Sequence, residues 1–123
     1  MYNKVMIVDD SDMDLLNSRI SISETNFATT VIIQKTAEDA LQYLEMSDDV
    51  PEVIFLDINM PGLSGFDFLE KFSKLDISIR TKCKVVMLSS SSSIEDIEHA
   101  EANKHVNRYI VKPLDASNLF TIN

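Results

Sequence analysis

The chain has 123 residues, of which 45% are hydrophobic and 25% are charged, so we expect residues 1–123 to form one globular domain. The formal net charge of −9 disfavours nucleic acid and anionic membranes as direct partners, because both bind basic surfaces. The sequence has no apolar stretch near the roughly 18 residues of a membrane span, no signal-peptide layout and a single cysteine, Cys83, and these features favour a cytoplasmic location.

Strand-like and helix-like segments alternate along the chain. Short apolar runs that end at Asp, Ser, Gly or Pro are typical of strands, and they cover residues 4–8, 30–34, 53–56, 83–88 and 109–111. Between them, apolar residues recur at the three- and four-residue spacing of amphipathic helices. The helical stripes are Met13, Leu16 and Ile20; Ala37, Ala40, Leu41 and Leu44; Phe68, Leu69, Phe72 and Leu75; and Ile94, Ile97 and Ala100. A short helix over 115–120 ends the pattern.

This alternation predicts an α/β fold in which five strands form one parallel sheet and five helices cover both of its faces. Short crossovers favour the doubly wound, flavodoxin-like strand order 2-1-3-4-5. In such sheets, ligands bind beyond the carboxyl ends of the strands, near the switch point between the first and third strands. The polar residues that end the predicted strands lie at that edge: Asp9, Asp10, Asp57, Ser89 and Lys112.

These five side chains have the chemistry of a site for a phosphoryl group. Neighbouring strands lie about 4.8 Å apart, so the three carboxylates repel one another unless a proton or a cation lies among them, and their oxygens suit Mg²⁺, Ca²⁺ or Mn²⁺. Lys112 and the hydroxyl of Ser89 can bind phosphoryl oxygens. Asp57 is then a candidate carboxylate nucleophile that forms an acyl phosphate.

Four motifs occur at the ends of the predicted strands. They are Val-Asp-Asp-Ser at 8–11, Leu-Asp-Ile-Asn-Met-Pro-Gly-Leu-Ser-Gly at 56–65, Leu-Ser-Ser at 88–90 and Tyr-Ile-Val-Lys-Pro at 109–113. In combination, and over essentially the whole chain, they resemble the receiver domains of bacterial two-component response regulators. The chain is similar in scale to the stand-alone chemotaxis receivers. The resemblance implies a signalling switch whose phosphorylation changes the binding of a downstream protein.

The resemblance also implies roles for the acidic residues. Asp57 would accept a phosphoryl group from a phosphohistidine on a sensor histidine kinase or a histidine phosphotransfer protein. Mg²⁺ would be bound by Asp10, Asp57 and the backbone carbonyl of Asn59, and Asp9 would help directly or through water.

Further implied roles concern the response to phosphorylation. Lys112 would bind a phosphoryl oxygen, and the peptide bond between Lys112 and Pro113 would be cis. Ser89 would follow the phosphoryl group inward. Tyr109 lies three residues before the lysine, where the family places a switch aromatic that can turn inward.

The chain departs from the family pattern before the fifth strand, where His105 and Val106 replace the usual Gly-Ala pair. A glycine there would close the preceding helix with a positive φ. We therefore expect Asn103 or Asn107 to take that conformation.

Two other classes of function fit part of this pattern. One is a phosphatase or phosphotransferase that works through an aspartyl phosphate, but enzymes of the haloacid dehalogenase type need a second acid where this chain has Asn59. The other is a receiver-like interaction module that accepts no phosphoryl group. Four intact residues argue against it: Asp10, Asp57, Ser89 and Lys112. We expect the chain to assist only its own phosphorylation and dephosphorylation, rather than to act as an enzyme on other molecules.

Overall fold

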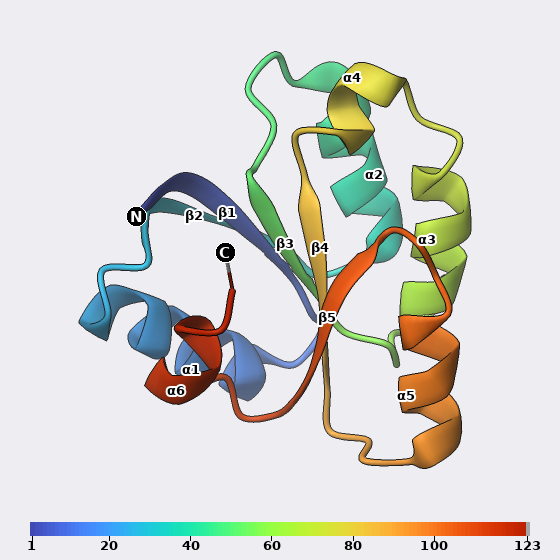
Figure 1. Cartoon of the computed structure of the whole chain (residues 1–123). Coiled ribbons are helices and arrows are strands. Elements are labelled where there is room, and N and C mark those ends of the chain that lie inside the picture. Colours follow the sequence, from blue (N-terminus) through green and yellow to red (C-terminus); the bar gives the residue numbers. More distant parts are fainter. Residues whose placement is uncertain (123) are drawn as a thin grey trace.

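The sheet of this protein has five parallel strands in the order β2-β1-β3-β4-β5, which confirms the predicted doubly wound arrangement (Figure 1). The structure is a computed structural model and describes residues 1–122. The strands are β1 (Tyr2–Val8), β2 (Ala28–Gln34), β3 (Val53–Leu56), β4 (Lys84–Ser89) and β5 (Val106–Val111). The helices are α1 (Asp12–Glu24), α2 (Ala37–Met46), α3 (Gly65–Phe72), α4 (Ile77–Arg80), α5 (Ile94–Glu101) and α6 (Ala116–Leu119).

The helices form a layer on each face of the sheet. Helices α2, α3 and α5 cover one face, and α1 and α6 cover the other (Figure 1). The sequence of strand β3 is uniformly apolar because the strand is buried on both faces. Ile54 and Leu56 pack into the first layer, and Val53 and Phe55 pack into the second. All four side chains are fully buried, so β3 is a rigid base for the residues that follow it. Within residues 1–122, no helix combines the length and apolarity that a membrane crossing requires.

Helix α4 is an element that the apolar periodicity did not predict. It has four residues, too few for a repeating stripe, and is capped by the preceding Asp76, whose carboxylate accepts a hydrogen bond from the backbone N–H of Ser78 at 2.9 Å. The guanidinium of Arg80 donates to the carbonyl of Leu75 at 2.8 Å and closes the connection between α3 and β4. Leu75 was expected on the helix stripe, but α3 ends at Phe72 and Leu75 packs against the same core from the connection.

Helix α1 has the predicted position but not the predicted packing face. The expected stripe of Met13, Leu16 and Ile20 is exposed, with 71%, 57% and 45% of each residue accessible to solvent. A neighbouring stripe is buried instead and consists of Leu15, Ser18 and Ile22. The hydroxyl of Ser21 donates to the carbonyl of Leu114 at 2.7 Å, a long-range bond that this rotation of the helix makes possible. Ile94 at the start of α5 is likewise exposed.

The turn before β5 is formed without a left-handed residue, so the expected positive φ at Asn103 or Asn107 is wrong. Within residues 1–122, Asn26 is the only non-glycine residue with a positive φ. The side-chain oxygen of Asn103 accepts a hydrogen bond from the N–H of His105 at 2.9 Å, and its carbonyl accepts one from Val106 at 3.1 Å. These two bonds close the turn in the place of a glycine. The peptide bond between Lys112 and Pro113 is cis, as the resemblance implies.

The packing face of α1 can be tested with two adjacent leucines. Leu15 is 4% exposed and Leu16 is 57% exposed. We expect Leu15→Ala to lower the free energy of unfolding by roughly 2–4 kcal/mol, because it leaves a cavity under the helix. The matched variant Leu16→Ala should change it by less than about 0.5 kcal/mol. Urea unfolding of both variants measures this, and a larger loss for Leu16→Ala would contradict the observed rotation of α1.

Candidate functional site

Backbone pairing that continues past the strand ends positions the polar residues. The N–H of Asp57 donates to the carbonyl of Val8 at 2.9 Å, so the residue after β3 is held beside the end of β1. The N–H of Lys112 donates to the carbonyl of Ser89 at 2.8 Å, so the residue after β5 is held beside the end of β4. The backbones of the predicted site residues therefore lie next to one another at one edge of the sheet.

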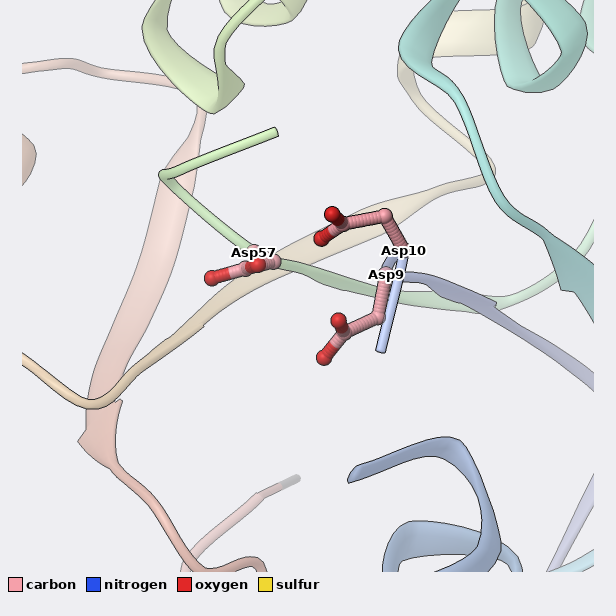
Figure 2. A group of neighbouring side chains, drawn as sticks. All are labelled: Asp9, Asp10 and Asp57. Atoms are coloured by element: carbon pink, nitrogen blue, oxygen red, sulfur yellow. The ribbon is translucent and has the colours of Figure 1, made fainter. Parts of the chain in front are cut away.

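Three carboxylates meet at this edge. Each of Asp9, Asp10 and Asp57 offers an oxygen within 4.8 Å of the others, and Figure 2 shows the three side chains extending into the same space. Asp9 and Asp57 are buried, whereas Asp10 is exposed. Oxygen donors at this spacing fit a hard divalent cation, which would offset their mutual repulsion. Asn59, the fourth predicted ligand, lies in the exposed loop after β3, two residues beyond Asp57.

Lys112 reaches this cluster, as the sequence predicted, but its bonds are not those expected. Its Nζ donates to Asp9 Oδ2 at 2.8 Å and lies 3.7 Å from Asp57 Oδ1. It also donates to Asp14 Oδ2 at 2.7 Å. The sequence analysis did not place Asp14 in the site. A signal was available, because Ser11 caps α1 and Asp14 is the third residue after the cap, in the first turn beside the end of β1.

Burial governs the charge state of Asp57. The pKa of this carboxyl is raised from 3.8 to about 6, and burial is the largest cause. The ammonium of Lys112 acts in the opposite direction, and the negative charge of Asp9 adds to the increase. For Lys112 itself, burial lowers the pKa, but the hydrogen bonds to Asp14 and Asp9 outweigh that effect and the pKa is raised. The lysine is therefore a permanent cation in this site.

Ser89 and Tyr109 both contact Ser91, just before α5. Ser89 is fully buried, and its Oγ accepts a hydrogen bond from the N–H of Ser91 at 3.1 Å. Tyr109 is half-buried, and its hydroxyl donates to the carbonyl of Ser91 at 2.7 Å. Ser91 therefore connects Ser89 to Tyr109 through two hydrogen bonds.

Gly65 holds the loop after Asp57 against the strand end. Its N–H donates to the carbonyl of Ile58 at 2.8 Å. A Cβ at this position would lie 2.5 Å from the backbone oxygen of Asp57, closer than any side chain permits. The glycine therefore lets α3 begin directly beside Asp57.

Comparison with known proteins identifies the family. A family model described as "Response regulator receiver domain" matches residues 5–122. The chain belongs to this family. Receiver domains are phosphorylatable signalling switches of two-component systems, and the matched range includes every residue of the site described above.

Solved structures of other receivers share this fold. A two-component response regulator from Cytophaga hutchinsonii is 29% identical, with a TM-score of 0.89 over 98% of this chain and 92% of that one. A receiver protein from Dyadobacter fermentans is 35% identical, with a TM-score of 0.86 over 94% and 91% of the two chains. The phosphorylated cyanobacterial phytochrome response regulator RcpA is 27% identical, with a TM-score of 0.80 over 98% and 88%.

Longer relatives also contain this domain. The transcriptional regulatory protein HptR of Staphylococcus aureus is 32% identical over 97% of this chain. The chain spans only 44% of the length of that relative. The comparison therefore supports a shared receiver and carries over nothing from the rest of HptR.

The raised pKa of Asp57 predicts a cost in stability that depends on pH. An acid with a raised pKa in the folded state favours folding while it is protonated, and this contribution is lost as the pH rises from 3.8 through about 6. In chelator at pH 8, we expect Asp57→Asn to be more stable than the parent by up to about 3 kcal/mol, since each pKa unit corresponds to about 1.4 kcal/mol. The difference should shrink at pH 5. Urea unfolding at both pH values measures it, and a variant less stable than the parent at pH 8 would contradict this account of the site.

Proposed function

We propose that Asp57 accepts a phosphoryl group from a phosphohistidine on a sensor histidine kinase or a histidine phosphotransfer protein. The observation that carries the proposal is the position of its buried carboxylate, which has an oxygen within 4.8 Å of those of Asp9 and Asp10 and lies 3.7 Å from the ammonium of Lys112. The similarity to RcpA, whose structure is that of a phosphorylated response regulator, supports it.

In the transfer, an oxygen of Asp57 bonds to phosphorus as the bond from phosphorus to the donor imidazole breaks. The imidazole leaves as a neutral base after it takes up a proton, and the product on this chain is an acyl phosphate. Mg²⁺ bound by Asp10, Asp57 and the Asn59 carbonyl, with Asp9 directly or through water, would neutralise charge on the carboxylates and the phosphoryl oxygens. This assignment rests on the donor set, in which hard oxygen ligands face one another.

Lys112 and Ser89 would bind the phosphoryl oxygens once the acyl phosphate has formed. The new group adds roughly 1.5 to 2 negative charges and three acceptor oxygens. Ser89 would turn its hydroxyl toward the phosphoryl group and give up its bond with the N–H of Ser91. Because Tyr109 donates to the carbonyl of Ser91, a shift at Ser89 would change the packing of Tyr109 and the surface beside α5.

The downstream effect would be a change in the binding of another protein, and the chain would act only on its own phosphoryl group. Hydrolysis of a separate substrate by the haloacid dehalogenase route uses a second acid two residues after the nucleophile. That position is Asn59, whose amide is too weak an acid to protonate a leaving group.

Phosphoryl labelling tests the acceptor. On incubation with Mg²⁺ and a small-molecule phosphodonor, we expect the intact mass of the parent to rise by one phosphoryl group. Asp57→Asn should not gain that mass, because an amide is no nucleophile here. The control Asp48→Asn changes an exposed acid that precedes β3, at the opposite end of that strand from Asp57, and should label like the parent. Full labelling of Asp57→Asn would show that another residue is the acceptor.

Metal dependence tests the carboxylate cluster separately. Excess chelator should abolish labelling, because three carboxylates without a cation repel an incoming phosphodianion. Added Mg²⁺ should restore it. Labelling at the parental rate in chelator would rule out the proposed role of Asp9 and Asp10.

A further inference from the structure

The ion pair between Asp14 and Lys112 is an unexplained contact of the site. Asp14 lies in the first turn of α1 and is neither a proposed metal ligand nor the phosphoacceptor. Its carboxylate makes the shorter of the two hydrogen bonds from Lys112 Nζ, 2.7 Å against 2.8 Å for Asp9. The separation from the proposed acceptor, Asp57, is longer at 3.7 Å. The ammonium is therefore held between Asp9 and Asp14 and not against Asp57.

We propose that Asp14 is a positioning residue that holds Lys112 toward α1 and competes with a phosphoryl group on Asp57 for it. This inference rests on the proposed role of Asp57 as acceptor. An ammonium has three N–H donors, and two of them are already used on Asp9 and Asp14. The third donor is free, but Nζ lies 3.7 Å from Asp57 Oδ1, so Lys112 would move toward Asp57 to bind the phosphoryl group closely, and the bond to Asp14 would lengthen as it does so.

The surroundings of Asp14 allow that exchange. Its side chain is 38% exposed, whereas that of Lys112 is 13% exposed. Asp14 and Lys112 line a hollow of about 250 Å³ together with Asn17, Ser18 and Ser90. Released from the lysine, the Asp14 carboxylate has room to rotate into water, where its charge is solvated. The exchange thus leaves no charge buried without a partner.

Asp12 provides a matched control. It lies two residues before Asp14 in the same turn of α1, and its carboxylate pairs with Lys35 at 2.6 Å. Asp12→Asn and Asp14→Asn each remove one negative charge from the start of the helix, so they alter the helix dipole interaction to a similar degree. Only Asp14→Asn removes an ion pair with Lys112.

The experiment measures the affinity of the full chain for beryllofluoride, a phosphoryl analogue, in the presence of Mg²⁺. We expect Asp14→Asn to bind it about two- to fivefold more tightly than the parent, the effect of one ion pair with a partly exposed partner. Asp12→Asn should match the parent, and Asp14→Glu should restore an affinity close to the parental value. With Lys112 labelled at Cε, its resonance in the free protein should shift in Asp14→Asn and stay in place in Asp12→Asn.

Three outcomes would overturn the inference. One is equal affinity of Asp14→Asn and the parent, and another is an equal gain in Asp12→Asn, which would reduce the effect to general charge. The third is an unchanged Lys112 resonance in Asp14→Asn. Failure of the parent to bind beryllofluoride at all would contradict the proposed role of Asp57, and this inference with it, so the two failures are distinguishable.

Discussion

Four carboxylates and one ammonium group gather at the carboxyl edge of the sheet. Lys112 bonds to Asp9 and Asp14 and lies near Asp57, while Asp10 completes the acidic cluster from the solvent side. One positive charge cannot balance four negative ones, and the raised pKa of Asp57 is a direct consequence of burial under these conditions. The site is therefore incomplete in electrostatic terms, and both a divalent cation and a redistribution of the lysine's hydrogen bonds can relieve it.

The fold tolerates this concentration of charge because its framework is rigid. Strand β3 is buried on both faces, and backbone hydrogen bonds continue past the ends of β3 and β5 to fix Asp57 and Lys112. Gly65 brings the start of α3 against the backbone of Asp57, so the acidic residue has little freedom to relax away from its neighbours. In a flexible loop, the carboxylates would move apart and so reduce their repulsion. Here the backbone keeps them close, so a cation that bound among them would relieve that repulsion.

Strand ends were predictable from the sequence, and helix rotations were not. An apolar run that stops at a polar residue marks the end of a buried strand, and parallel pairing then places Asp9, Asp57, Ser89 and Lys112 at one edge.

The rotation of α1 has no local signal of this kind, because Met13, Leu16 and Ile20 are spaced as well as Leu15 and Ile22 for a helical stripe. The observed rotation packs Leu15 and Ile22 against distant parts of the chain and brings Ser21 to Leu114, 93 positions away in the sequence. The cap at Ser11 places Asp14 in the first turn of α1, but nothing near Asp14 in the sequence indicates its partner Lys112, which is 98 positions away. The turn at Asn103 was mispredicted because a side-chain oxygen can replace a left-handed backbone.

The most direct test of this account is a crystal structure of the chain with Mg²⁺ and beryllofluoride. The account requires the analogue on the Asp57 carboxylate, with Lys112 Nζ within about 3.2 Å of one of its fluorine atoms and beyond hydrogen-bonding distance of Asp14. An analogue bound elsewhere would contradict the role of Asp57. An analogue on Asp57 with Lys112 still bonded to both Asp9 and Asp14 would contradict the claim that the lysine is exchanged between these acids and the phosphoryl group.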